Sequence, residues 1–136
     1  MVNYLKEVID KLSLWIEGNQ SVGNWLKING YPELYMLNDA VSRHTKALEY
    51  LLIKKHFILA AFVNAIWDDS KALDFLLKNK GTQWAATANY INGDEKAGIW
   101  LEKNKLDHYA KLADKIRAKL RKEGDQATSI FNSPIK

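Results

Sequence analysis

Residues 91 to 101 read Ile91-Asn92-Gly93-Asp94-Glu95-Lys96-Ala97-Gly98-Ile99-Trp100-Leu101. A near-copy lies far upstream and reads Glu17-Gly18-Asn19-Gln20-Ser21-Val22-Gly23-Asn24-Trp25-Leu26. Both stretches hold a glycine, an asparagine or aspartate, a second glycine and a Trp-Leu pair at the same offsets, and both continue to an asparagine, Asn29 and Asn104. Self-similarity of this kind is the signature of a repeat architecture.

A shift of 25 residues aligns four copies of the chain. One column of the alignment is always aromatic, the next is always leucine, and three others stay apolar in every copy. The columns are Trp25, Tyr50, Phe75 and Trp100; Leu26, Leu51, Leu76 and Leu101; Val22, Ala47, Ala72 and Ala97; Leu34, Leu59, Trp84 and Tyr109; and Val41, Ile66, Ile91 and Ile116. One apolar match at this spacing would be chance, but five columns held through four copies indicate that the chain is built from equal units.

Within each copy the apolar residues follow a helical period. In the third copy, Ala72, Phe75 and Leu76 are spaced i, i+3 and i+4, and Trp84 and Ala88 are again four apart. Each copy therefore predicts two short helices of about 10 residues. We expect one helix over residues 3–17, pairs near 20–42, 45–67, 70–92 and 95–122, and a longer last helix over 106–122.

Polar residues mark the expected helix ends. A side-chain oxygen placed before a helix accepts from its free backbone N–H groups, and replacing such a cap by alanine costs about 1 kcal/mol. This predicts N-caps at Asn19, Asp69 and Asp94, with Thr45 capping in place of His44. The first helix of a pair is expected to end on an asparagine suited to the left-handed conformation, at Asn29, Asn79 and Asn104.

One short helix pair cannot bury its own apolar face, whereas stacked neighbours can. The sequence therefore predicts an all-α solenoid of about nine short helices, made of four helix-pair repeats of 25 residues and an N-terminal capping helix. In such an array each unit contacts only its neighbours, and the long first and last helices would cover the two open ends. We expect one repeat domain over residues 1–122 and a disordered tail over residues 123–136.

The motif Trp25-Leu26-Lys27-Ile28-Asn29, repeated as Trp100-Leu101-Glu102-Lys103-Asn104, resembles an uncharacterised bacterial group of short helical-hairpin repeats with a Trp-Leu-x-x-Asn signature. The join between residues 90 and 101 looks like the connection between the two helices of an ankyrin repeat, without the ankyrin β-turn arm or its Thr-Pro-Leu-His motif. The period is shorter than that of ankyrin repeats, about 33, or of HEAT repeats, about 40. The resemblance covers residues 5–120 and implies an ankyrin-like or HEAT-like binding scaffold with no activity of its own.

Composition excludes several classes of protein. A hydrophobic content of 47% argues against general disorder, and the absence of cysteine excludes disulfides and thiolate metal sites. No apolar run reaches the roughly 18 residues that a membrane span needs, and the first residues have no signal-peptide pattern. We therefore expect a cytoplasmic protein.

The net charge of +4 is unevenly distributed. Residues 103–122 hold eight Lys or Arg and two Asp, a balance of +6, and the rest hold twelve basic and fourteen acidic residues, a balance of −2. A solvated cap face is the simpler interpretation, because cations stabilise a helix C-terminus. The alternative is contact with nucleic acid or an anionic surface, made by Lys111, Lys115, Arg117, Lys119, Arg121 and Lys122.

The sequence offers no arrangement typical of an active site or a metal site. His44, His56 and His108 have no metal-ligand spacing. The paired acids at residues 68–69 and 94–95 recur at expected helix starts, where they favour the positive end of the helix dipole. We expect no catalytic residue, no metal and no cofactor. An enzyme whose residues meet only in the fold stays as a third alternative.

Positions held constant through the copies should serve the fold, whereas positions that vary are free for function. One short polar column predicts a structural hydrogen bond to the next turn, made by Asp39, Asn64, Asn89 and Asp114. Leu52 and Leu77 stand where the outer copies have charged residues. These two leucines either line a groove or are buried by neighbours on both sides, and we favour burial.

Trp67 is the clearest candidate contact residue, because its column otherwise holds Ser42, Asn92 and Arg117 and so requires no apolar side chain. An exposed Trp is a typical binding anchor, whereas a Trp that folds back over a neighbouring helix is structural, and the average burial of Trp slightly favours the second. We predict a non-enzymatic scaffold that binds a protein or peptide, with candidate contact residues Trp67, Tyr90, Glu33, Ile58, Gln83 and His108.

Overall fold

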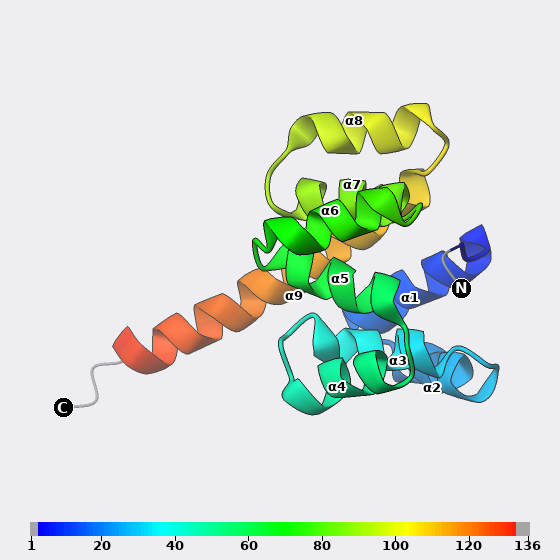
Figure 1. Cartoon of the computed structure of the whole chain (residues 1–136). Coiled ribbons are helices and arrows are strands. Elements are labelled where there is room, and N and C mark those ends of the chain that lie inside the picture. The colour runs from blue at the N-terminus through cyan, green and yellow to red at the C-terminus, as the bar shows by residue number, and fades with distance from the viewer. Residues whose placement is uncertain (1–2, 133–136) are drawn as a thin grey trace.

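The computed structural model describes residues 3–132, and their side chains as far as residue 124. This part of the chain is all-α and holds nine helices joined by short turns (Figure 1). The helices are α1 (Lys6–Glu17), α2 (Gln20–Ile28), α3 (Pro32–Ala40), α4 (Thr45–Ile53), α5 (Phe57–Ile66), α6 (Ser70–Lys78), α7 (Thr82–Ile91), α8 (Glu95–Lys103) and α9 (Asp107–Asn132). The predicted fold class, a helical repeat of nine helices, is confirmed.

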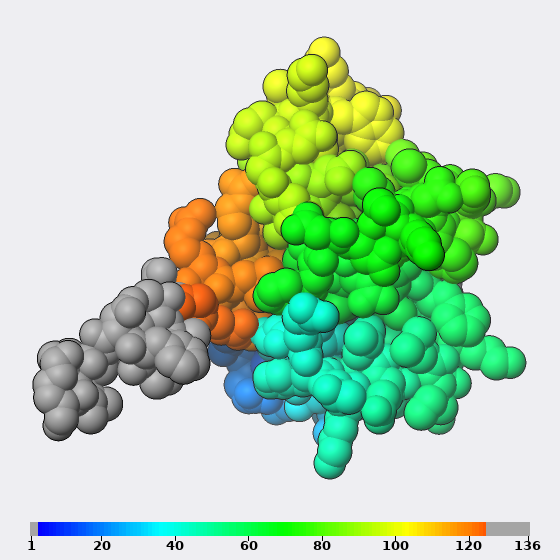
Figure 2. All heavy atoms as spheres, turned by 60° about the vertical axis from the view of Figure 1, so that its left-hand side comes forward, coloured from blue at the N-terminus to red at the C-terminus, as the bar shows by residue number. Residues whose placement is uncertain are grey.

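The helices form two sets. The odd-numbered helices, here called the inner helices, pack against one another, because α1 contacts α3 and α9 while α7 contacts α5 and α9. The even-numbered outer helices pack on the inner ones, and Figure 2 shows successive units stacked from cyan through green to yellow, with α9 in orange beside them. Inner helix α5 buries seven residues, whereas outer helix α4 buries only Ala47 and Leu51. The apolar columns thus supply one continuous core.

The two ends of the array meet. Helices α1 and α9 form the most extensive helix–helix contact (Figure 1), and Glu17 forms an ion pair with Lys115 across it. The ring of Tyr4, just before α1, lies edge-on to that of Trp84 in α7, with ring centroids 6.3 Å apart. The expectation that α1 and α9 cover opposite open ends is therefore wrong. Both helices carry an apolar stripe, and packing the stripes together removes them from water.

Among helices that are adjacent in sequence, the more extensive contact joins each inner helix to the outer helix that follows it. We call these pairs the four joints: α1–α2, α3–α4, α5–α6 and α7–α8. They pack more extensively than the two helices of a predicted copy, such as α4 with α5 or α6 with α7. The structural unit is therefore offset by one helix from the copy that the sequence alignment suggests.

Every turn between the described helices contains one residue in the left-handed conformation, always at the same point of the period. The joints use Gly18, Arg43, Asp68 and Gly93, and the turns back to the inner helices use Gly30, Lys55, Lys80 and Lys105. Their φ angles lie between 58° and 115°. Glycine adopts this conformation freely, whereas any other residue is disfavoured by about 1–2 kcal/mol.

The asparagines that were expected to be left-handed lie one residue earlier and are not. Asn29, Asn79 and Asn104 have φ angles of −95°, −112° and −96°. Each donates from its side-chain Nδ2 to the carbonyl of the aromatic residue four positions earlier, at 2.9, 2.8 and 2.8 Å. The Trp-Leu-x-x-Asn signature therefore provides a side-chain cap for the last turn of an outer helix, where backbone carbonyls lack partners.

The predicted N-caps are confirmed at Asn19, Asp69 and Asp94, whose side chains accept from backbone N–H groups of the following turn. The proposed cap at Thr45 is wrong, because Thr45 is already the first residue of α4 and the N-cap residue is His44. The His44 side chain makes no capping hydrogen bond. One outer helix of the four therefore begins without a side-chain cap.

The short polar column is not buried, and its proposed side-chain hydrogen bond is wrong. Asp39 and Asp114 are exposed. The turn is bonded through main-chain carbonyls of the same column instead, with N···O distances of 3.2, 3.1 and 3.0 Å for His44 to Asp39, Asp69 to Asn64 and Asp94 to Asn89. The backbone geometry of the turn, which every joint shares, therefore does not depend on the side chains of this column.

Two glycines at the joints leave room for aromatic rings. A Cβ on Gly23 would lie 2.3 Å from the Trp15 ring, and one on Gly98 would lie 2.7 Å from the Tyr90 ring. At the equivalent positions of the middle joints the sizes are exchanged, since the ring is replaced by alanine and the glycine by leucine. These pairs are Ala40 with Leu48 and Ala65 with Leu73.

The long helix α9 extends further than predicted. It continues to Asn132 instead of ending at residue 122, and its C-terminal part projects beyond the other helices (Figure 1). The first residues of the expected tail therefore belong to α9. Residues 133–136 lie outside the described part of the chain.

Candidate functional site

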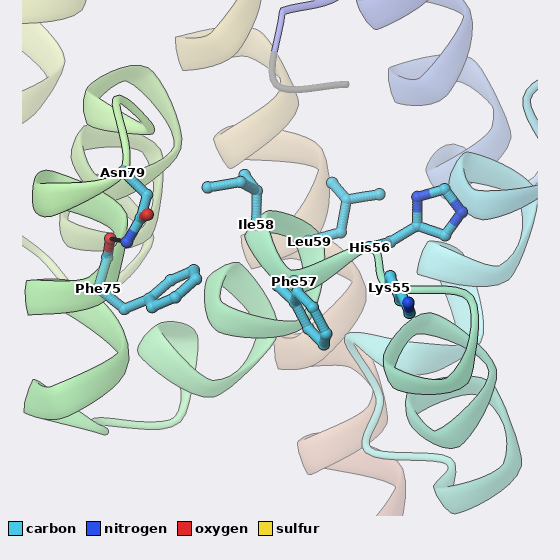
Figure 3. Close-up of a pocket in the computed structure, with 7 residues that line it drawn as sticks. All are labelled: Lys55, His56, Phe57, Ile58, Leu59, Phe75 and Asn79. Atoms are coloured by element: carbon cyan, nitrogen blue, oxygen red, sulfur yellow. Dashed lines mark hydrogen bonds between the residues drawn. The ribbon is translucent and has the colours of Figure 1, made fainter.

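A hollow of about 280 Å³ lies at the start of α5, and we call it the α5 hollow (Figure 3). It is lined by Lys55, His56, Phe57, Ile58, Leu59, Phe75 and Asn79. Phe75 comes from α6 and points towards the first turn of α5, from which Phe57 and Ile58 project (Figure 3). The site thus combines residues of two consecutive units.

Local sequence explains why these side chains meet. The left-handed Lys55, with a φ of 63°, turns the chain between α4 and α5. Asn79 donates from Nδ2 to the Phe75 carbonyl at 2.8 Å and so closes the last turn of α6 beside the hollow. The N-cap residue of α5 is His56, which makes no side-chain hydrogen bond to the helix. The first-turn amides of α5 therefore lie at the hollow without a side-chain cap.

Large apolar side chains are exposed on α4, on α6 and at the start of α5, and two of them, Phe57 and Phe75, line the α5 hollow. We call them the α4–α6 surface, and their exposed fractions range from 38% to 74%: Leu52, Ile53, Phe57, Phe75 and Leu77. The prediction that Leu52 and Leu77 are buried is wrong, because they are 46% and 53% exposed. Each faces away from the inner helices, since the buried side of its outer helix is already taken by Leu51 or Leu76.

The edge of the molecule formed by the turns from outer to inner helices is rich in lysine. The turns from outer to inner helices carry exposed lysines, Lys54, Lys55, Lys78, Lys80, Lys103 and Lys105. The opposite edge, where each inner helix turns into the next outer helix, carries both signs: the exposed acids Glu17, Asp68, Asp69, Asp94 and Glu95, and the exposed bases Arg43, Lys46, Lys71 and Lys96. Cations at helix C-termini and acids at N-termini both complement the helix dipole. The α5 hollow lies on the lysine edge.

Only one of the predicted contact residues, the half-buried Ile58, lines the α5 hollow. Glu33, Gln83 and His108 occupy the same column but are buried, with 7%, 9% and 9% of their surface exposed. Glu33 accepts from the Tyr4 hydroxyl at 2.8 Å, and Gln83 donates to Asn3 at 2.8 Å. These two positions are occupied by the chain's own N-terminal segment.

The pKa shifts in this region follow from burial. Burial, followed by the hydrogen bond to Glu33, raises the pKa of Tyr4 well above its usual range. Burial raises the pKa of Tyr109 to about 12, and it lowers the pKa of His108, whose Nδ1 has no hydrogen-bond partner among the described residues. Such shifts keep the groups neutral, as expected for core residues.

Trp67 folds back over a neighbouring unit and yet keeps part of its side chain exposed. Its Nε1 donates to the Val41 carbonyl at 3.0 Å, and the Arg43 guanidinium lies 5.0 Å from its ring, so the side chain folds back onto the α3–α4 joint. It is nevertheless 42% exposed. It borders a second hollow of about 310 Å³ with Ile66, Asp68, Ile91, Asn92, Arg117 and Leu120.

The variable column of Trp67 has a shared structural role that the sequence alignment did not show. Asn92 donates from Nδ2 to the Ala65 carbonyl at 3.2 Å, and Arg117 donates to the carbonyl of Tyr90. With Trp67, three residues of different type thus donate to the end of the preceding inner helix. This column therefore serves the fold as well, although its residue type varies.

Tyr90 is held in the structure on both sides. The Arg117 guanidinium lies 4.9 Å from its ring centroid, and Gly98 lies against the ring. Asp114, together with partial desolvation, raises the pKa of Tyr90. Its contacts assign Tyr90 to the α7–α8 joint, and it does not line the α5 hollow.

The predicted basic patch is only partly available to a ligand. Lys115 pairs with Glu17, Lys119 pairs with Glu123 at 2.9 Å, and Arg117 binds Tyr90. Lys111, Arg121 and Lys122 are exposed. Lys115 and Arg117 therefore hold α9 against the rest of the molecule, whereas Lys119 pairs within α9.

Sequence reasoning missed Phe57 and Phe75. Phe75 belongs to the constant aromatic column, which was assigned to the fold, yet this column lies at the surface, with Trp25, Phe75 and Trp100 between 37% and 38% exposed. One signal was present. The column after it is leucine in every copy, and a nine-residue helix that packs on one side cannot bury both neighbouring columns.

None of the helices in the described part of the chain is both long and apolar enough to cross a bilayer. Among the same residues, no three His, Asp or Glu side chains are grouped so that they could hold a metal ion. Comparisons with protein-family models, characterised proteins and solved structures give no match. The all-α arrangement in sequential helix pairs is thus established by the structure, while the ankyrin-like or HEAT-like resemblance rests on the sequence pattern.

Proposed function

We propose that the chain is a non-enzymatic, cytoplasmic scaffold that binds another protein through the α4–α6 surface. The observation that carries the proposal is that two exposed aromatic side chains, Phe57 and Phe75, line one hollow between consecutive units, while the outer helices on either side expose further leucine and isoleucine side chains. Single exposed apolar residues are common, whereas a gathered patch is typical of an interaction site. The absence of cysteine agrees with a reducing compartment.

The partner is a different protein and not a second copy of this chain. In a twofold dimer the same patch meets itself, so the lysines that border the hollow would face lysines of the other copy. Like charges placed together at an interface disfavour association. Sedimentation equilibrium should therefore show a monomer at micromolar concentration, and a dimer that Phe75→Ser dissociates would contradict the proposal.

Capture with matched variants tests the scaffold function. The immobilised protein should retain a partner from native lysate that is lost on Phe57→Ser and Phe75→Ser. Trp100→Ser is the matched control, because Trp100 stands in the same column as Phe75 and both are 38% exposed. The captured protein, once purified, should bind the wild type and the control alike. Equal loss in all three variants, or no loss in any, would remove the α4–α6 surface from consideration.

A further inference from the structure

We infer that the α5 hollow recognises an acidic peptide segment that carries an aromatic or aliphatic side chain flanked by Asp or Glu. The inference rests on the proposed scaffold function and names the chemistry of its partner. An apolar anchor suits the floor of the hollow, which Phe57, Ile58 and Phe75 form. The rest of the recognition comes from charge around that floor.

The hollow exists because one repeat lacks a covering side chain. In the first copy Trp25 is stacked against Tyr31, with ring centroids 6.1 Å apart and an angle of 15° between the planes. The residues equivalent to Trp25 and Tyr31 two copies later are Phe75 and Gly81. No side chain from Gly81 can therefore cover Phe75.

The backbone does not require a glycine at position 81. Its φ is −97°, a conformation that other residues adopt freely. A Cβ there would meet Leu76 at 3.1 Å and the Ile58 side chain at 3.3 Å, close enough to intrude on the hollow's apolar wall. Glycine at this point keeps open a space that an aromatic side chain fills in the first copy. A partner's apolar side chain would take the equivalent place against Phe75.

The border of the hollow is cationic. Of the seven residues that line it, none is acidic and Lys55 is basic. Lys54 and Lys80 adjoin the lining residues in sequence and are exposed, and among the described residues the side chains of these three lysines make no ion pair. Lys78 is paired with Asp74 at 2.9 Å, which offsets both charges. Three unpaired cations beside an apolar floor complement carboxylates that flank an apolar residue.

The first turn of α5 adds to this preference. Its N-cap residue has no side-chain hydrogen bond to the helix, and the N-terminal end of a helix favours negative charge. The floor is aromatic and aliphatic and, among the described residues, Lys55 is the only lysine that lines it, so a nucleic-acid backbone, which is bound by many phosphate contacts, fits the hollow less well than an apolar side chain does. The observations favour an acidic peptide, and nucleic acid becomes an outcome of the test.

The test is a titration of the full ¹⁵N-labelled chain, followed by amide chemical shifts. The probes are a blocked peptide Glu-Glu-Phe-Leu-Glu-Glu, the same peptide with every Glu replaced by Gln, and single-stranded oligothymidylate. The acidic peptide should shift the amide signals of Ile58, Phe75 and Asn79. It should also bind at least about fivefold more tightly than the Gln peptide, because the Gln peptide has no carboxylates to attract the lysines. Raising the salt concentration should narrow the difference.

Lysine variants test which cations attract the acidic peptide. Lys55→Gln combined with Lys80→Gln should weaken the acidic peptide about fivefold and leave the Gln peptide unchanged. Lys105→Gln is the matched control, because Lys105 is exposed and has the same left-handed conformation in the next turn, with a φ of 58° compared with 63° for Lys55 and Lys80. The control should bind like the wild type.

The negative outcomes are distinct. Equal binding of the acidic and Gln peptides at the hollow would overturn the carboxylate preference while leaving the scaffold function standing. Tighter binding of oligothymidylate at the same amides, or shifts that map elsewhere, would overturn the inference outright. Failure of the scaffold function itself would appear in the capture experiment, as retention that ignores Phe57 and Phe75.

Discussion

At the two terminal joints, α1–α2 and α7–α8, an aromatic ring fills the interface and a glycine makes room for it. At the two middle joints, α3–α4 and α5–α6, the equivalent places hold alanine and leucine. The left-handed turn residue changes in step, since it is Gly18 or Gly93 at the terminal joints and Arg43 or Asp68 at the middle ones. One backbone geometry therefore accommodates two packing solutions.

At the terminal joints the inner helix supplies the large side chain, whereas at the middle joints the outer helix supplies it. Where Trp15 or Tyr90 reaches across, nothing larger than hydrogen is tolerated opposite. The middle joints distribute similar bulk to the outer helix, where Leu48 and Leu73 pack against the core. The proposed binding surface lies over the middle units, where the outer helices also carry exposed leucines.

The strongest way to break the comparison is to put the middle-joint residue into a terminal joint. Gly23→Leu and Gly98→Leu should each destabilise the protein by about 3 kcal/mol. The new side chain would collide with an aromatic ring that is held in place by its closely packed neighbours. Urea unfolding followed by circular dichroism measures the loss. A change below about 0.5 kcal/mol would mean that a terminal joint accepts leucine in place of glycine without loss of the aromatic ring opposite it.

Exchanging both partners should recover much of that loss. Tyr90→Ala with Gly98→Leu reproduces the pair found at the middle joints, so the double variant should be more stable than the sum of the single changes by about 2 kcal/mol. A double-mutant cycle in the same unfolding assay gives the coupling. Additive effects would show that the ring and the glycine are independent.

A smaller effect is expected from the donor that closes a middle joint. Trp67→Phe removes the hydrogen bond to the Val41 carbonyl and should cost about 1 kcal/mol. Trp100→Phe is the control, because the Trp100 ring nitrogen makes no hydrogen bond within the described residues and its loss should cost less. Equal values for both variants would assign the effect to ring size alone.

The smallest difference concerns the turn residues. Lys105→Gly should stabilise the protein by roughly 0.5–1 kcal/mol, since Lys105 has a φ of 58° and relief of the left-handed strain exceeds the entropy that glycine adds to the unfolded chain. Gly93→Arg should destabilise it by about 1 kcal/mol for the same reason. Thermal unfolding of both variants beside the wild type shows the sign, and a shift of Lys105→Gly to lower temperature would refute the account of the turns.

The repeat period predicted the elements because each helix depends on nearby residues. The leucine column is fully buried in all four units, and the caps at Asn19, Asp69 and Asp94 lie where side chains can reach the next turn. The left-handed residue lies one position after each asparagine that was expected to adopt this conformation. The asparagines cap the helix with their side chains instead, as Asn79 does by donating to the Phe75 carbonyl.

Closure of the array could not be predicted from the period. It depends on pairs far apart in sequence, such as Tyr4 with Glu33, Gln83 with Asn3 and Lys115 with Glu17. Each of these contacts occurs only once among the described residues, so it leaves no repeated pattern in the sequence. The same reason explains the wrong assignment of Glu33, Gln83 and His108 as free surface, because their burial depends on the N-terminal segment and on α9.

The candidate site was predicted only through Ile58. Phe75 looked structural because its column is constant, and the absence of a covering side chain at Gly81 becomes visible only when the turn is compared with Trp25 and Tyr31 in three dimensions. Constancy through the copies thus marks what the outer helices share, and does not separate buried from exposed positions.

Native-state hydrogen exchange tests most directly the claim that the repeat is closed by its own ends. If α1 and the part of α9 up to Leu120 seal each other, their slowest amides should exchange only through global unfolding, with protection within about 1 kcal/mol of that in α5 and α7. An open array would lose its end helices first. Protection in α1 and α9 that lies several kcal/mol below that of the middle helices would contradict the closed arrangement.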